Sequence, residues 1–179
     1  MRDWNVVVTV FQGGYRRALR PLRDLGPVER SPYHNVLVMK VDDPLTLLAA
    51  VETCTRESPA LYDAISRVAP AQRAFDFQMA DEFLAMAEGL IREWAPCLAG
   101  SSCHVRLHLC GLKHAITTQE MERSLDGAIV EATAAAGHPA RIAFEDADAV
   151  VGIDVIDARA GLGLWRREGL IRYRMLRPD

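Results

Sequence analysis

The spacing of apolar residues predicts alternating strands and helices in the first part of the chain. Val6–Phe11 is short and rich in β-branched residues, which indicates a strand. Tyr15–Leu25 repeats apolar residues at helical spacing, and its arginines fall mostly on the opposite face. Val28–Arg30 indicates a short strand and Asn35–Val41 a longer one.

A second helix is predicted to begin at Asp42-Asp43-Pro44, where a capping acid precedes a proline at the first helical position. Ser58-Pro59 interrupts this helix, the helical pattern resumes over Leu61–Val68, and Ala71–Phe77 indicates a strand. The resulting order of strand, helix, strand, strand, helix, strand is the split βαβ order. We therefore expect an α/β (α+β) chain in which residues 1–78 form a ferredoxin-like βαββαβ domain.

The second half of the chain opens with its most regular helical pattern, over Asp81–Trp94. Cys103–Cys110 then alternates like a strand. Thr117 and Glu120 have the spacing of a capping box, in which the threonine oxygen accepts from a free helix amide and the glutamate reaches back. This spacing predicts a helix that begins at Thr117.

The last part of the chain predicts strands. Arg141–Phe144 and Val150–Val155 indicate one strand each. Leu162–Trp165 and Leu170–Met175 predict a final hairpin that turns at residues 166–169. With a boundary near residue 78, residues 79–179 form the second predicted domain.

Composition narrows the class of protein. The 179 residues suffice for one domain or two small ones, and half of them are hydrophobic, which is ample for a packed core. The net charge of −3 argues mildly against nucleic acid as a partner, but binding depends on where charges lie and not on their sum. No apolar run approaches a membrane span, and no signal pattern opens the chain. Four cysteines are too few for a disulfide scaffold, so we expect a cytoplasmic chain with reduced thiols.

Arginines gather in two stretches of the sequence, whereas acids concentrate elsewhere. The early group is Arg16, Arg17, Arg20, Arg23 and Arg30, and the late group is Arg159, Arg166, Arg167, Arg172, Arg174 and Arg177. Such segregation can create a basic face on an acidic protein, and arginine forks suit phosphate oxygens. Charge alone favours the alternative, an ordinary solvated surface.

The loop before Thr117 is a second candidate for phosphate contact. The free amides and the dipole of a helix N-terminus favour anions, and Lys113 and His114 lie in the loop that leads to it. A solvated loop lysine is an alternative of equal weight for Lys113. Arg106 should project from the strand face opposite Val105, where it either reaches RNA or pairs with an acid nearby.

Rival chemistries find less support. His108 and Cys110 sit about 6.6 Å apart on one strand face and could share a zinc ion, but no Cys-x-x-Cys pair is present, and such residues are more often part of a core. Gly161-Leu-Gly163 has too few glycines for a dinucleotide loop and is better explained as a turn. No P-loop and no G-x-S-x-G elbow occurs. The sequence thus predicts no metal, no cofactor and no enzyme.

An ordered series of features in the second half resembles the THUMP domain, an RNA-binding module of tRNA-modifying enzymes. The series comprises the strand His104–Leu109, the break at Gly111, the helix start at Thr117–Glu120 and the buried strand within Ala147–Val155. Ala64–Pro70 resembles the junction that precedes THUMP in the adaptor proteins of tRNA cytidine acetylation. The chain departs from the family at Leu109-Cys110, where the family favours an arginine-rich pair, and at Ala147, where it has proline.

The resemblance implies a function as well as a fold. It implies binding of tRNA by residues 79–179 and a role as a non-catalytic adaptor for a separate tRNA-modifying enzyme. Only 24 residues follow Val155, too few for a catalytic domain. The RNA-binding residues we expect are Arg16, Arg17, Arg106, Lys113, His114, Thr117, Arg159, Arg166 and Arg167. The alternatives are a protein–protein scaffold without RNA binding and a small metal-dependent enzyme.

Overall fold

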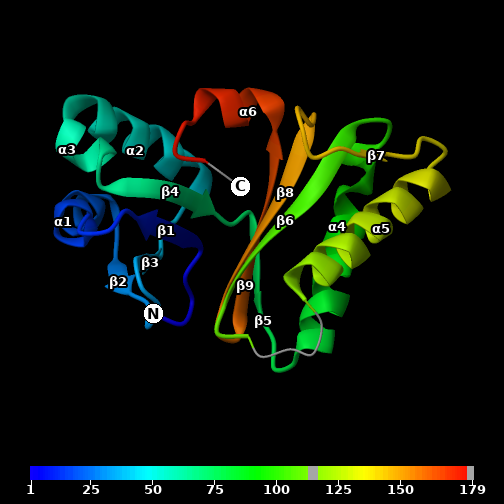
Figure 1. Cartoon of the computed structure of the whole chain (residues 1–179), viewed down its shortest axis with the longest axis horizontal. Helices are drawn as coiled ribbons and strands as arrows, with labels where there is room; N and C mark the ends of the chain where they lie inside the picture. The colour runs from blue at the N-terminus through cyan, green and yellow to red at the C-terminus, as the bar shows by residue number, and fades with distance from the viewer. Residues whose placement is uncertain (113–116, 177–179) are drawn as a thin grey trace. The chain divides into compact units, whose positions relative to one another are not determined.

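The computed structural model describes residues 1–112 and 117–176, which divide into two compact units (Figure 1). The first unit takes in Met1–Ala74 and the chain from Gly169 onward, and the second is Phe75–Glu168. The fold is therefore mixed α and β with two separate sheets. Among the described residues, no helix is long and apolar enough to cross a membrane.

The first unit is built on a four-stranded antiparallel sheet. Its elements are β1 (Val6–Val10), α1 (Tyr15–Leu25), β2 (Val28–Arg30), β3 (Val36–Met39), α2 (Pro44–Glu57), α3 (Pro59–Tyr62) and β4 (Ile65–Pro70). The strand order is β2-β3-β1-β4, and each neighbouring pair is antiparallel. The β-branched run of β1 thus occupies a central position, where Val6, Val7 and Val8 are all buried.

The predicted start of α2 is confirmed. The Asp43 side chain accepts hydrogen bonds from the amides of Leu45 and Thr46, and Pro44 occupies the first helical turn. Since Pro44 has no amide hydrogen, it fits a position where that hydrogen would lack a helical partner.

The helix predicted over residues 61–68 is wrong. Leu61 belongs to the four-residue α3, and the chain is already extended in β4 from Ile65 onward. Val68 lies opposite Val8 in the sheet and is fully buried. Pairing with the buried central strand outweighs the helical spacing of the apolar residues, as tertiary packing often overrides local preference. The strand predicted over residues 71–77 exists as β5 (Arg73–Asp76), but it belongs to the second sheet.

The second unit carries a five-stranded sheet with strand order β5-β9-β8-β6-β7. Its remaining elements are α4 (Ala80–Leu98), β6 (Ser102–Cys110), α5 (Thr118–Ala135), β7 (Arg141–Ile142), β8 (Ala149–Ile156) and β9 (Arg159–Arg166), and α6 (Arg167–Arg172) follows them. Strand β6 runs parallel to β7 and β8, and β9 is antiparallel to β8.

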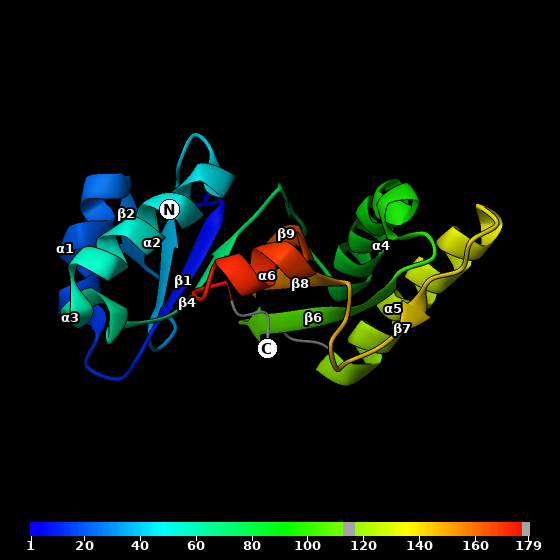
Figure 2. The same cartoon turned by 90° about the horizontal axis from the view of Figure 1, so that it is seen from above.

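Helices α4 and α5 both lie on one face of this sheet (Figures 1 and 2). The core between helices and sheet contains apolar residues from every layer, namely Phe83, Ile91, Val105, Leu125, Ile129, Ile153 and Leu162. The regular apolar spacing of α4 and the alternation of β6 therefore bury their faces against each other, as the sequence predicted.

The final hairpin predicted over residues 162–175 is also wrong. The hairpin consists of β8 and β9, with Ile156 opposite Arg159 and a positive φ of 54° at Asp157 in the two-residue turn. Aspartate tolerates this left-handed conformation better than most residues. The segment predicted to turn, residues 166–169, instead enters α6.

The glycines of Gly161-Leu-Gly163 lie within β9 and not in a turn. The indole of Trp165 lies over the strand, and a Cβ atom at Gly163 would be 2.6 Å from its nitrogen. Gly163 is therefore required by close packing.

The end of the described chain packs with the first unit. The Val68 amide donates to the Met175 carbonyl oxygen at 2.8 Å, and Met175 and Leu176 are buried. The predicted second domain, residues 79–179, instead assigned this tail to the second half. A division into independently folding domains at residue 78 stays a prediction.

Candidate nucleic-acid interface

The N-terminus of α5 has the capping box that the sequence predicted. The Thr117 hydroxyl oxygen accepts from the Glu120 amide at 3.2 Å, and the Glu120 carboxylate accepts from the Thr117 amide at 2.6 Å. The hydrogen bonds that the Glu120 carboxylate accepts from the Thr117 amide and hydroxyl lower the pKa of Glu120 below its usual value. Lys113 and His114, the preferred phosphate contacts, lie outside the described residues.

Arg159 lies at the end of the sheet from which the chain leads to α5. Arg159 pairs with Ile156, Ile156 pairs with Cys110, and the Asp157 amide donates to the Cys110 carbonyl oxygen at 2.8 Å. The Arg159 side chain is 15% exposed and forms an ion pair with Asp76 at 2.7 Å. Part of the Arg159 charge is therefore already balanced, and its contact with RNA stays a prediction.

Arg166 and Arg167 lie at the opposite end of the same sheet. Arg166 pairs with Ala149, which lies opposite Cys103 at the start of β6. Because β8 and β9 are each eight residues long, the two ends are about 20 Å apart. The structure thus does not bring these arginines together with Thr117.

Both arginines at that end bind acceptors within the second unit. Arg166 donates to the Cys97 carbonyl oxygen. Arg167 forms ion pairs with Asp148 at 3.0 Å and with Asp146 at 3.4 Å. Hydrogen bonds from Ser102, assisted by the nearby charge of Arg167, hold the pKa of Asp148 below its usual range. Arg167 therefore helps to hold the loop before β8.

Arg106 projects from the sheet face opposite the helices, as expected, because its neighbours Val105 and Leu107 belong to the core. It is half-buried, and in the sheet it lies opposite Gly152. On the same face, the His104 ring nitrogen Nδ1 lies 2.8 Å from the Ala143 carbonyl oxygen. No group of three His, Cys, Asp or Glu side chains suited to a metal ion occurs in residues 1–112 and 117–176.

Arg16 and Arg17 lie in the first unit, on α1. Both are exposed, as are Arg20 and Arg23, whereas Ala18 and Leu22 form the buried side of the helix. This is the amphipathic division that the sequence predicted, so α1 presents four basic side chains to solvent.

Two carboxylates contact the backbone of β6, and these contacts were not predicted from the sequence. β7 pairs with Ser102 and Cys103, and within the described chain no strand continues along that side of β6. The Val105 amide donates to Asp126 at 2.7 Å and the Leu107 amide to Glu122 at 2.8 Å. Helix α5 thus supplies acceptors where a neighbouring strand would. The four-residue spacing of two acids on one helix was the available signal.

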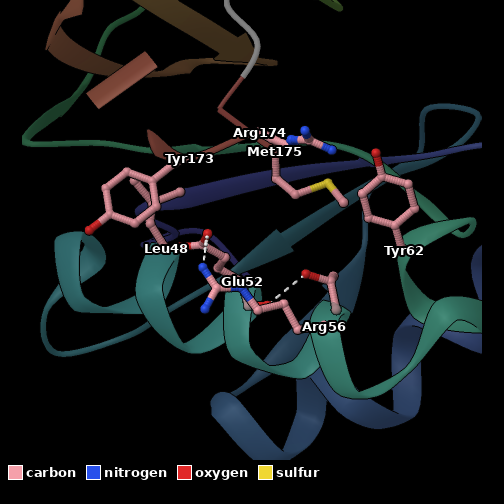
Figure 3. A pocket seen from close by; sticks show the side chains of 8 residues that line it. Leu48, Glu52, Arg56, Tyr62, Tyr173, Arg174 and Met175 are labelled. Carbon is pink, nitrogen blue, oxygen red and sulfur yellow. Dashed lines mark hydrogen bonds and ion pairs between the residues drawn. The ribbon is translucent and has the colours of Figure 1, made fainter. Parts of the chain in front are cut away.

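A pocket in the first unit was also missed. It lies among α2, α3 and the C-terminal segment, and the rings of Tyr62 and Tyr173 stand on either side of Met175 in Figure 3. The pocket could hardly be predicted from the sequence, because the residues that line it come from distant parts of the chain.

Comparison with known proteins gives matches of structure but not of sequence. No protein-family model matches the chain, and no curated protein sequence does. PH1313 from Pyrococcus horikoshii Ot3 is 12% identical with a TM-score of 0.63, over 89% of this chain and 53% of that one. A 4-thiouridine synthetase, solved as an RNA complex with bound ATP, is 13% identical with a TM-score of 0.54, over 92% and 42%. A possible methylase from Clostridium difficile 630 is 10% identical with a TM-score of 0.56, over 90% and 40%.

These likenesses are of fold. PH1313 and the synthetase support a THUMP-like fold for this chain, which spans about half of their length or less. The similar structures also correct one prediction. The expectation that the chain is not an enzyme is wrong as an inference from its fold, because structures that share the fold include a synthetase and a possible methylase.

Proposed function

We propose that this chain binds structured RNA of the tRNA class. The observation that carries the proposal is the shared fold with a 4-thiouridine synthetase whose structure was solved with RNA. The exposed basic side of α1 and the capped N-terminus of α5 support it, because phosphate oxygens favour arginine forks and helix amides.

We further propose that the RNA is held for modification. The resemblance to the adaptor proteins of tRNA cytidine acetylation implies a separate tRNA-modifying enzyme as a second partner. The similar structures include a 4-thiouridine synthetase and a possible methylase, each a longer chain than this one, and they support a role in tRNA modification.

Two finer assignments belong to the same proposal. We infer a ferredoxin-like arrangement for the first unit from its order of elements and its strand order β2-β3-β1-β4. We propose a cytoplasmic location, supported by four cysteines that all carry free thiols.

The test is a gel shift of purified protein with tRNA over a range of salt concentrations. Binding should weaken steeply as salt rises, because each phosphate contact releases counterions. A folded protein that binds no tRNA at low salt would overturn the proposal and favour a protein–protein scaffold.

A double variant tests whether α1 of the first unit is part of the RNA interface. Arg16→Ala with Arg17→Ala should weaken tRNA binding and reduce the salt slope by about two, one for each lost phosphate contact. Arg92→Ala, which removes an arginine from α4 in the second unit, is the control and should leave the slope unchanged. Equal effects of the double variant and the control would exclude α1 from the interface.

A further inference from the structure

The pocket of the first unit has a volume of about 210 Å³. Its lining residues are Leu48, Glu52, Thr55, Arg56, Tyr62, Tyr173, Arg174 and Met175. Helix α2 forms the floor, α3 contributes Tyr62, and the C-terminal segment supplies the last three residues (Figure 3). The pocket contains none of the residues of the interface proposed above.

The C-terminal wall of the pocket is held in place by backbone hydrogen bonds. The Met175 carbonyl oxygen accepts from Val68 on β4 at 2.8 Å, and the Leu176 amide donates to the Tyr173 carbonyl oxygen at 2.9 Å. Met175 and Leu176 are buried. The wall is thus part of the packed unit, so the pocket is formed before any ligand arrives.

The size and lining of the pocket suit one flat ring system. Its volume lies below the roughly 300–1,000 Å³ typical of sites for drug-sized ligands. Tyr62 is 39% exposed, and its ring and that of Tyr173 flank the Met175 side chain in Figure 3. Aromatic rings and a thioether are good surfaces for a planar heterocycle.

The charges around the pocket favour a ligand that also carries an anion. Arg56 and Arg174 line it together with Glu52, the one acid among its described lining residues, and the Glu52 carboxylate lies 2.7 Å from the Arg56 guanidinium. The guanidinium of Arg172 lies 5.1 Å from the ring centroid of Tyr173. The Arg56 side chain is 74% exposed, so it can turn toward a phosphate at the mouth.

We propose that this pocket binds one unpaired nucleobase together with its phosphate, and that the nucleotide belongs to the RNA of the proposed function, on which this inference rests. Tyr62 and Tyr173 stack on the base, Glu52 accepts from its exocyclic amine, and Arg56 and Arg174 contact the phosphate. Single-stranded RNA is commonly bound in this way, with splayed bases on aromatic side chains. A free nucleoside monophosphate offers the same chemistry, so the test must separate the two sources.

The experiment measures fluorescence anisotropy of a labelled single-stranded RNA of about ten nucleotides, within the usual range of single-strand sites. Tyr62→Ala and Tyr173→Ala should each weaken binding about 5- to 150-fold, the range that one base–aromatic stack contributes. Tyr62→Phe and Tyr173→Phe keep the ring and should bind like the wild type. The same RNA with abasic sites should bind the wild type weakly, and its affinity for the alanine variants should be equal to its affinity for the wild type.

The outcomes separate this inference from the proposed function. Melting temperatures first show whether the alanine variants are folded. If the wild type binds tRNA and the oligonucleotide, and both folded alanine variants bind them equally well, the pocket assignment is wrong and the proposed function stands. If the wild type binds adenosine monophosphate in a Tyr62-dependent manner but no tRNA, the proposed function fails and the site takes free nucleotides. If it binds none of these ligands, both are overturned.

Discussion

The contact between Trp165 and Gly163 sets a narrow steric limit on one residue of β9. A Cβ atom at Gly163 would lie 2.6 Å from the indole nitrogen, whereas one at its cross-strand partner Gly152 would lie 3.7 Å away, an ordinary contact. Gly163→Ala should therefore cost about 1–3 kcal/mol of unfolding free energy, as overpacking does. Gly152→Ala should be close to neutral. Urea unfolding followed by tryptophan fluorescence measures both, and equal losses would contradict the steric account.

Asp126 gives the chain a pH dependence of a definite sign. Burial raises the pKa of this carboxyl from 3.8 to about 6, although the bond from the Val105 amide opposes the rise. The folded state therefore holds the proton more tightly than the unfolded state. The stabilising contribution of the protonated Asp126 carboxyl is present below pH 4 and is lost as the pH rises to about 6.

Asp126→Asn removes this titration and keeps an acceptor for Val105. Relative to the wild type, the variant should gain up to about 3 kcal/mol of stability between pH 4 and pH 7, the equivalent of two pKa units. Denaturant unfolding at several pH values measures the gain. Asp126→Ala should be less stable than Asp126→Asn by about 1–3 kcal/mol at pH 7, because it leaves a buried amide without its acceptor. Parallel pH profiles for the wild type and Asp126→Asn would refute the shifted pKa.

At the scale of elements, the start of α5 depends on its capping box. Thr117→Ala removes the oxygen that accepts from the Glu120 amide, so it should lower the unfolding free energy by about 1 kcal/mol. Gln119→Ala changes an exposed residue of the same helical turn and is the control. Thermal unfolding compares the two variants, and an equal shift for both would mean that the box contributes little.

Elements that depend on local chemistry could be predicted from the sequence, and elements that depend on distant partners could not. The caps at Asp43 and Thr117 bond to amides within three residues, so their spacing was sufficient. The first four residues of β4, 65–68, were mistaken for helix because their pairing with β1 is non-local. Gly161-Leu-Gly163 resembled a turn because its pairing with β8, which places it inside a strand, is not visible in the local sequence.

The same distinction applies to the candidate sites. The basic face of α1 follows from helical periodicity and was predicted. The separation of Arg166 from Thr117 follows from the sheet register, which the sequence did not reveal. The pocket joins Tyr62 to Tyr173 through the return of the tail to β4, a long-range contact without a local signature.

At the scale of the whole molecule, the tail completes the first unit. A variant that ends after Arg172 loses the buried side chains of Met175 and Leu176 and the bond to Val68. It should be less stable than a variant that ends after Leu176, by about 2–5 kcal/mol for each lost side chain as an upper bound. Calorimetry of the two variants checks this, and coincident transitions would show that the tail adds no stability.

The carboxylates of α5 along β6 also bear on how chains behave toward one another. A strand edge with open amides is a template for another strand, and such edges promote intermolecular pairing and aggregation. Here the amides of Val105 and Leu107 are occupied by Asp126 and Glu122, which also place negative charge beside that edge. Removing both carboxylates would expose β6 to strands of other copies, so the double alanine variant should aggregate during refolding at concentrations where the wild type stays dispersed.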